Sequence, residues 1–229
     1  MHRLAQDREI LERIRTGVAA EGSSDWTTAA GEFARALELH PAEPQGSTAW
    51  YDLGIARAGL SDFDGAAGAF AKAIERDPGF LAARANLVHV ELARNDLDAA
   101  RHAADAFVTA APDSARALYA RGLVALRAGD AASARSDFGK LLSNDPSYAV
   151  AHYDLALAEQ RLGHDGDAER ELRSALVLAP KYARARLALG AVLLRRGNRA
   201  GARSAFDEAA STADPLLHNL AVSLRDAVH

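Results

Sequence analysis

The fold is decided by residues 47–79, which read STAWYDLGIARAGLSDFDGAAGAFAKAIERDPG. Seven residues of this stretch stand at spacings that recur four more times downstream: Trp50, Leu53, Gly54, Ala66, Phe70, Ala73 and Pro78. The recurrence is clearest at the last of them, because proline returns at one constant interval as Pro112, Pro146 and Pro180. A constant period of a few tens of residues is the sequence signature of a repeat array.

Residues of matching size recur in register with the prolines. The Leu53 position is followed at the same interval by Leu87, Arg121, Leu155 and Leu189. The Ala66 position becomes Ala100, Ala134, Ala168 and Ala202, and the Phe70 position becomes Ala104, Phe138, Leu172 and Phe206. Each unit is therefore expected to bury its apolar face on its neighbours, without one large central core.

An earlier copy lies upstream, and its offset is slightly larger than the interval between the later copies. Its members are Gly17, Ala29, Phe33, Ala36 and Pro41. Three residues have been added before the next copy, and Pro44, Gln45 and Gly46 have the composition of a turn. We predict a slightly longer loop between repeats at these three residues.

Three motifs of the stretch resemble those of the tetratricopeptide repeat (TPR), a helix-turn-helix unit: Trp50-x2-Leu53-Gly54, Ala66-x3-Phe70 and Pro78. The chain departs from the family pattern at Arg57, where a tyrosine is usual, and the glycine becomes Val88 and Ala156 in two copies. The resemblance covers residues 10 to about 215. It implies an all-α fold, a right-handed α-solenoid of antiparallel helix pairs.

A single array is predicted over residues 1–229, with six repeats and a terminal helix. The repeats fall at about 10–43, 47–80, 81–114, 115–148, 149–182 and 183–215. Residues 3–20 are expected to open the first repeat as a helix with one apolar side, formed by Leu4, Ile10, Leu11, Ile14 and Val18. Residues 216–228 predict a short capping helix with one apolar edge, formed by Leu216, Leu220, Leu224 and Val228, and a dimerisation helix is the alternative.

Turn chemistry marks the break between the two helices of each unit. A residue that tolerates left-handed backbone is followed by a helix-capping residue at Ser61-Asp62, Asn95-Asp96, Gly129-Asp130, Gly163-His164 and Gly197-Asn198. Glycine and asparagine end a helix in that conformation, and aspartate or asparagine accepts the first free N–H groups of the next. Each pair therefore predicts a helix end followed by a helix start.

Composition limits the classes of function. The formal charge of −4 does not indicate a generic nucleic-acid binder, which is usually strongly basic, and the lack of cysteine excludes disulfides and thiolate chemistry. The first twenty residues are too rich in charge for a signal peptide or a membrane span, which predicts a cytoplasmic protein. An exported protein whose signal sequence has been removed is the alternative.

The sequence offers little catalytic or metal chemistry. The close histidine and carboxylate pairs are His89-x-Glu91, His152-x-Asp154 and His164-Asp165. None has the i, i+4 histidine spacing of a helical metal site, and no phosphate-binding loop or nucleophile elbow is present. We predict no enzyme activity, no metal and no cofactor.

By the resemblance, the first helix of each unit lines a concave groove that holds a segment of a partner protein. The positions that the resemblance places in this groove are Tyr51, Asp52, Ile55, Asn86, His89, Arg116, Tyr119, Leu123, Tyr153, Asp154, Leu157 and Arg184. Tyrosine is enriched among residues that dominate binding energy. The alternative is that Tyr51, Tyr119 and Tyr153 fill the seam between neighbouring helices. The terminal-carboxylate clamp of chaperone adaptors is not predicted. The family's leading lysine is replaced at Ile14, Tyr51, Ala85 and Tyr119, its final arginine is replaced by Ala120, and Asn86 followed by Arg116 is the only fragment of the clamp.

The predicted function is a non-enzymatic scaffold that binds an amphipathic helix or an extended peptide of another protein. One alternative is a regulatory domain of a larger protein. Another is head-to-tail self-assembly, since residues 21–79 hold ten acidic and four basic residues, whereas residues 180–206 hold seven basic residues and no acidic one. No nucleic-acid partner and no membrane insertion are predicted.

Overall fold

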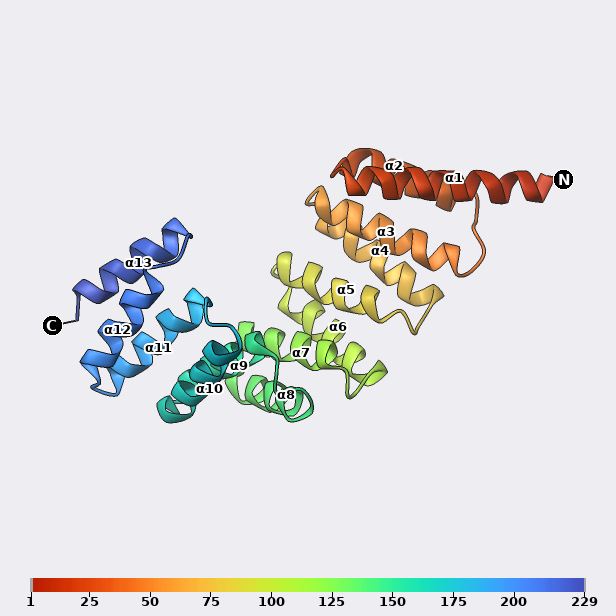
Figure 1. Cartoon of the computed structure of the whole chain (residues 1–229). Coiled ribbons are helices and arrows are strands. Elements are labelled where there is room, and N and C mark those ends of the chain that lie inside the picture. The colour runs from red at the N-terminus through yellow and green to blue at the C-terminus, as the bar shows by residue number, and fades with distance from the viewer. Residues whose placement is uncertain (1, 229) are drawn as a thin grey trace. The chain divides into compact units, whose positions relative to one another are not determined.

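The computed structural model describes residues 2–228, and all of its regular secondary structure there is helical. The chain divides into two compact units, Met1–Pro112 and Asp113–His229. Within each unit, helices that follow one another in sequence pack side by side in antiparallel fashion (Figure 1). The described helices include none that combines the length and the apolar character needed to cross a membrane.

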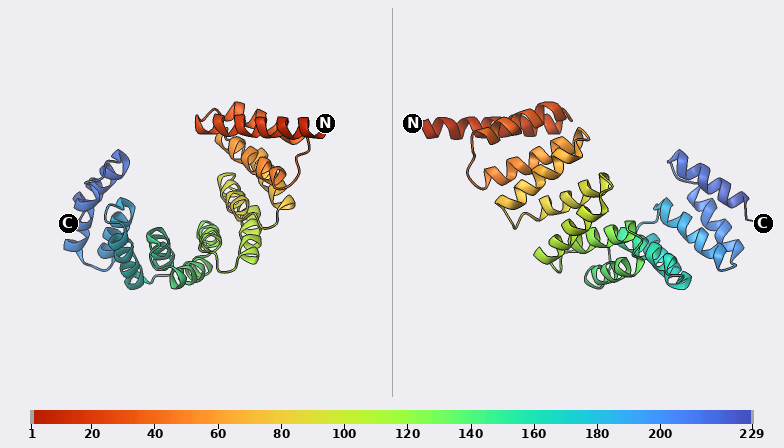
Figure 2. Two further views of the ribbon diagram at one scale, coloured as in Figure 1. Left: turned by 45° about the vertical axis from the view of Figure 1, so that its right-hand side comes forward. Right: turned by 180° about the vertical axis from the view of Figure 1, so that it is seen from behind.

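The first unit contains three helix pairs, which Figure 2 shows from two further sides. Their bounds are α1 His2–Gly22, α2 Trp26–Glu38, α3 Gln45–Gly59, α4 Phe63–Arg76, α5 Leu81–Ala93 and α6 Leu97–Ala110. The second unit contains three more pairs and a last helix. Their bounds are α7 Ala115–Arg127, α8 Ala131–Asn144, α9 Ala149–Arg161, α10 Asp165–Leu178, α11 Ala183–Arg195, α12 Arg199–Ala209 and α13 Pro215–Asp226.

The turn within each pair follows the predicted chemistry. The residue before the cap has a positive φ at each predicted turn: Ser61, Asn95, Gly129, Gly163 and Gly197. The next residue accepts a backbone N–H from the following helix at Asp62, Asp96, Asp130 and Asn198. His164 is the exception among these, since its side chain forms no cap hydrogen bond and its Nδ1 lies 2.7 Å from Oε2 of Glu159.

In four helix pairs, a glycine in the first helix faces a phenylalanine in the second. A Cβ added to Gly122 would lie 2.7 Å from the Phe138 ring, and one added to Gly17, Gly54 or Gly190 would lie 2.4–2.7 Å from the ring of Phe33, Phe70 or Phe206. These rings are almost completely buried. Glycine therefore allows the two helices to approach while a large ring fills the space between them.

The inserted residues are placed differently from the prediction. The connection between α2 and α3 spans residues 39–44 and is longer than the connection at 77–80, as expected. Gln45 and Gly46, however, are helical and belong to the first turn of α3. The prediction of a loop at these two residues was wrong, because the insertion lengthens the helix as well as the connection.

The terminal helices bury other faces than the sequence pattern predicted. On α1, Ile10 is buried and Ile14 is half-buried, but Leu4, Leu11 and Val18 are exposed. On α13, Leu216 is 81% exposed and Leu220 is also exposed, while Leu217, Ala221 and Leu224 face α12. Val228, just beyond the end of α13, is buried in the same cluster. Neither apolar edge was predicted correctly at every position, because a terminal helix is covered by a neighbour on one side only.

Candidate functional site

In the first unit, the predicted residues Tyr51 and Asn86 meet across neighbouring repeats. The Asn86 Nδ2 donates a hydrogen bond to the Tyr51 Oη at 3.2 Å. The Tyr51 ring packs on Phe80 with a centroid separation of 4.8 Å and on Phe70 at 5.8 Å. Ile55 lies against the same apolar cluster. The bond therefore connects α3 to α5 at the surface of their seam.

The second unit repeats this arrangement with a carboxylate. Tyr119 donates a hydrogen bond from its Oη to Oδ2 of Asp154 at 2.7 Å, and this bond connects the same two repeat positions as the bond of Tyr51. The Tyr119 ring packs on Tyr148 at 5.6 Å, and Tyr153 packs on Tyr182 at 5.1 Å. Four tyrosines of α7, α9 and the connections before α9 and α11 thus gather around one aspartate. We call Tyr119, Tyr148, Tyr153, Tyr182 and Asp154 the tyrosine cluster.

The sequence analysis missed three aromatic residues that take part in these contacts: Phe80 in the first unit, and Tyr148 and Tyr182 in the second. Each follows a first-helix tyrosine at one fixed interval, in the pairs Tyr51/Phe80, Tyr119/Tyr148 and Tyr153/Tyr182. The third repeat has alanine at position 85 and serine at position 114, and Ser114 caps α7 instead. The paired occurrence of aromatic residues at this spacing was a signal available in the sequence.

Burial shapes the electrostatics of the tyrosine cluster. Asp154 is only 6% exposed, and this desolvation raises the pKa of its carboxyl, while the hydrogen bond from Tyr119 opposes the change. Burial, Asp154 and Tyr153 raise the pKa of Tyr182 to about 12, and burial followed by Asp154 also raises the pKa of Tyr119 and of Tyr153. These phenols therefore remain protonated hydrogen-bond donors near neutral pH.

The predicted site residues differ in their accessibility. His89, Arg116 and Arg184 are exposed, and Asp154 is buried within the tyrosine cluster. The others are half-buried: Tyr51, Asp52, Ile55, Asn86, Tyr119, Leu123, Tyr153 and Leu157. The three tyrosines pack on core residues of their own units, so they contribute to the seam between helices and also present an accessible edge.

Asp52 lies near a second carboxyl group, that of Glu21 at the end of α1. Desolvation followed by the Asp52 charge raises the pKa of Glu21 to about 7, and desolvation raises the pKa of Asp52 to about 6. The Glu21 Oε1 is buried and has no hydrogen-bond partner among the described residues. The ionised form of this pair is therefore unfavourable in the folded state.

We expect this pair to make the first unit less stable as the pH rises. A carboxyl whose folded-state pKa is raised stabilises the fold below its unfolded pKa, here near 4.5 for Glu21, and this contribution is lost as the pH rises through about 7. Glu21→Gln should therefore raise the melting temperature at pH 8. It should also make the melting temperature depend less on pH between pH 5 and 8. Thermal unfolding followed by circular dichroism measures this. Glu38→Gln, at an exposed glutamate of α2, is the matched control, and an unchanged pH profile in Glu21→Gln would contradict the assignment.

An apolar hollow lies beside the tyrosine cluster. It has a volume of about 600 Å³ and is lined by Ala149, Val150, Ala179, Pro180, Lys181 and Tyr182. Val150 is 43% exposed and Lys181 supplies its one charged side chain. Such a hollow can accept an apolar side chain of a ligand next to a polar group.

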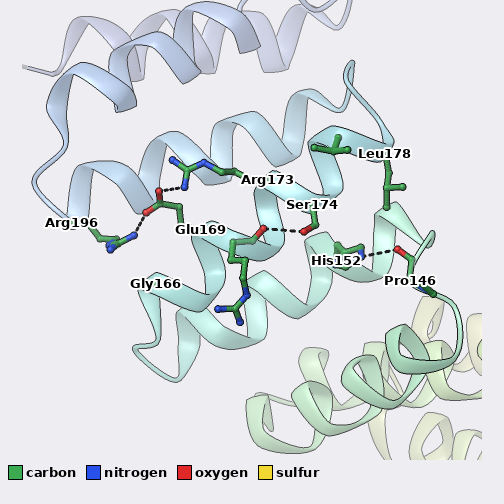
Figure 3. Close-up of a pocket in the computed structure, with 10 residues that line it drawn as sticks. Pro146, His152, Gly166, Glu169, Arg173, Ser174, Leu178 and Arg196 are labelled. Carbon is green, nitrogen blue, oxygen red and sulfur yellow. Dashed lines mark hydrogen bonds and ion pairs between the residues drawn. The ribbon is translucent and has the colours of Figure 1, made fainter.

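A second hollow of about 570 Å³ lies on α10 and is shown in Figure 3. Its arginines Arg173 and Arg196 both pair with the buried carboxylate of Glu169. His152 is engaged as well, by the carboxylate of Glu171 at 2.7 Å and the carbonyl oxygen of Pro146 at 3.0 Å. Arg170 pairs with Asp167 at 2.8 Å. The charged groups of this hollow are thus already paired within the fold, and the hollow offers a weaker site for an ionic ligand than one with unpaired charges.

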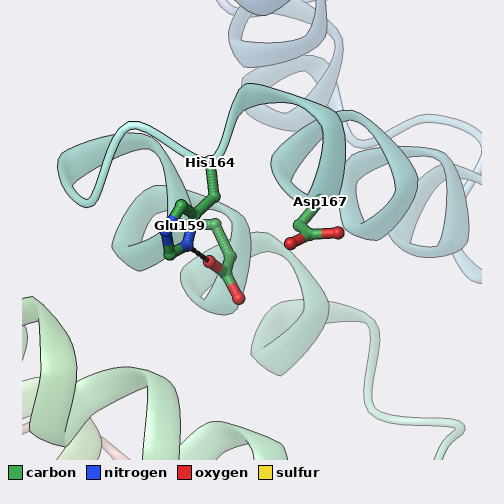
Figure 4. A group of neighbouring side chains, drawn as sticks. All are labelled: Glu159, His164 and Asp167. Atoms are coloured by element: carbon green, nitrogen blue, oxygen red, sulfur yellow. Dashed lines mark hydrogen bonds and ion pairs between the residues drawn. The ribbon is translucent and has the colours of Figure 1, made fainter.

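Glu159, His164 and Asp167 bring three ligand-type side chains within 4.8 Å of one another (Figure 4). Both oxygens of Glu159 already have partners, since Oε1 accepts from Nε of Arg135 at 2.7 Å and Oε2 bonds to His164. A cation placed here would lie near the Arg135 guanidinium and would break the bond to His164. We therefore assign no metal to this group.

Comparison with known families agrees with the repeat geometry. The model of the tetratricopeptide repeat matches residues 14–79, 86–149 and 153–216. The chain belongs to the tetratricopeptide repeat family. Each matched segment spans two of the observed helix pairs, so TPR sequence and TPR structure agree over most of the chain. Proteins of this family typically act as protein-interaction modules.

Solved TPR structures share the fold. MamA is 24% identical with a TM-score of 0.64, over 71% of this chain and 89% of that one. A TPR protein from Parabacteroides merdae is 16% identical with a TM-score of 0.69, over 96% and 98% of the two chains. YrrB, described as a TPR protein with an unusual peptide-binding site, is 17% identical with a TM-score of 0.64, over 85% and 100%. A search of curated protein sequences gives no significant match.

Proposed function

We propose that this TPR protein is a non-enzymatic module that binds a peptide or helix segment of a partner protein on the first-helix face. In each unit this face comprises the predicted site residues of that unit, together with Phe80 in the first unit and with Tyr148, Val150 and Tyr182 in the second. One observation carries the proposal: the apolar hollow at Val150 is lined by Tyr182, whose ring packs on Tyr153 and which belongs to the partly accessible tyrosine cluster. Aromatic residues around an apolar hollow are typical of peptide-binding grooves. The peptide-binding site in the description of YrrB gives the proposal a precedent within the fold.

A matched pair of substitutions tests this site. A random peptide library is panned against the full chain, and the affinity of enriched peptides is measured by fluorescence polarisation. Val150→Glu should weaken binding at least tenfold, because a charge placed in the hollow must be desolvated by the ligand. Val177→Glu introduces the same charge at a valine of α10 that is 79% exposed and lines the other hollow, and it should leave the affinity unchanged. Loss of binding in Val177→Glu alone would place the site on α10 instead.

Head-to-tail self-assembly is the less favoured function. The hypothesis relies on seven basic side chains near the C-terminal end, and three of them are engaged within the fold. Arg195 pairs with Asp165 at 2.6 Å, Arg186 pairs with Glu208 at 3.1 Å, and Arg196 pairs with Glu169. The charge that remains for a second copy is correspondingly smaller.

A further inference from the structure

Three equivalent positions of the second unit form a row with an apolar centre and basic ends. Arg116, Val150 and Arg184 stand at the same place in three successive repeats and open the first helices α7, α9 and α11. All three side chains are exposed. Neither arginine forms an ion pair with another side chain of the described residues, unlike Arg195 and Arg196 on the same unit.

The surroundings of this row are apolar or basic. Val150 opens into the hollow that contains Tyr182 and Lys181, and Lys181 is exposed as well. Arg184 lies close enough to lower the pKa of both Tyr153 and Tyr182 against the larger effect of burial. The carboxylate of the tyrosine cluster, Asp154, is buried and accepts the bond from Tyr119. A ligand therefore meets cations on both sides of an apolar hollow.

We infer that the second unit binds an extended protein segment in which a large apolar residue is flanked on both sides by acidic residues. This inference rests on the proposed function and specifies the chemistry of its partner. The apolar side chain enters the hollow beside Val150, one carboxylate pairs with Arg116, and the other pairs with Arg184 or Lys181. Charge complementarity of this kind selects a partner and sets its register.

The spacing of the acidic residues follows from the packing of the repeats. Directly packed helices lie roughly 8–10 Å apart. Successive first helices such as α7 and α9 touch less extensively than the helices of one pair, so the upper end of this range applies to them. An extended chain advances about 3.3 Å per residue. A segment that crosses the first helices therefore places its carboxylates about three residues before and about three residues after the apolar anchor. A helical segment advances only about 1.5 Å per residue and would need about six residues for the same distance.

Synthetic peptides and a charge reversal test the inference on the full chain. The first peptide is short and has a central tryptophan, with glutamate three positions before and after it; the second has glutamine and the third has lysine at these two positions. Wild type should bind the glutamate peptide about tenfold more tightly than the glutamine peptide, and added salt should reduce the difference. The double substitution Arg116→Glu with Arg184→Glu should reverse the preference, so that the lysine peptide binds best.

A matched control is Arg199→Glu, at an exposed arginine of α12, which should keep the wild-type preference. All variants should melt as wild type does, since the substituted side chains are exposed and without ion pairs among the described residues. Equal binding of the three peptides by wild type, or an unchanged preference in the double variant, would overturn the inference. Tighter binding of a single-stranded oligonucleotide than of the glutamate peptide would overturn it too. If the inference is overturned in any of these ways, the proposed function can still be tested separately. It stands if the peptides enriched from the random library still lose affinity in Val150→Glu.

Discussion

Replacing Gly122 by valine should cost about 3 kcal/mol of unfolding free energy, because the new side chain overlaps a fully buried ring. The Cβ alone would lie 2.7 Å from Cε1 of Phe138, whose ring has no exposed surface. Phe138→Ala should cost about 3–5 kcal/mol through the cavity that it leaves. Urea denaturation of the full chain measures both values.

The third repeat indicates how the protein tolerates a larger residue at this position. Val88 stands where the fourth repeat has Gly122, and Ala104 stands where that repeat has Phe138. A fully buried phenylalanine, Phe107, lies one turn further along α6. The double variant Gly122→Val with Phe138→Ala should therefore lose less than the sum of the single losses, by about 1–2 kcal/mol. Adding Leu141→Phe, at the position equivalent to Phe107, should recover most of the unfolding free energy that the double variant still lacks. Strict additivity of the three substitutions would contradict this account of the packing.

The features that could be predicted from the sequence are those that each repeat determines locally. The positive φ at Gly129 and the cap at Asp130 follow from two adjacent residues. The positive φ recurs in all five predicted turns, and the side-chain cap recurs in four of them. The repetition then predicted the pairing of helices, because a repeat that buries one face on the next repeat must present that face at a fixed interval. His164 broke the capping pattern because its imidazole bonds to Glu159, a contact that adjacent residues alone do not specify.

The features that the sequence analysis missed depend on contacts across repeat boundaries or on a missing neighbour. Tyr148 and Tyr182 belong to the candidate site because they stack on Tyr119 and Tyr153, and the motif of a single repeat does not include the spacing of these pairs. On α13, leucines at positions 216, 217, 220 and 224 give two possible apolar faces. The buried face was decided by packing on α12, so the alternation of apolar residues was not sufficient.

Arg121 and Asp137 replace an apolar contact of the other repeats by an ion pair, and the loss of the arginine should be costly. The Arg121 Nε donates to Oδ2 of Asp137 at 2.8 Å and its Nη2 donates to Oδ1 at 2.6 Å. The Asp137 side chain is 7% exposed, whereas that of Arg121 is 36% exposed. Arg121→Leu leaves a carboxylate buried without this partner and should cost about 2–3 kcal/mol, below the range for a fully buried pair. Asp137→Ala should cost less, because the arginine can turn towards water.

The double variant decides whether the pair is required for stability. Arg121→Leu with Asp137→Ala copies the combinations Leu53/Ala69, Leu87/Ala103 and Leu189/Ala205 of three other repeats. Its free energy of unfolding should lie within about 1 kcal/mol of the wild-type value or exceed it, since a well-packed apolar pair often stabilises a fold as much as a buried ion pair does. Urea denaturation of the full chain gives the four free energies of the cycle. If the double variant is as unstable as Arg121→Leu, the carboxylate is not the source of the loss, and the aliphatic stem of Arg121 would instead be filling space that leucine cannot fill.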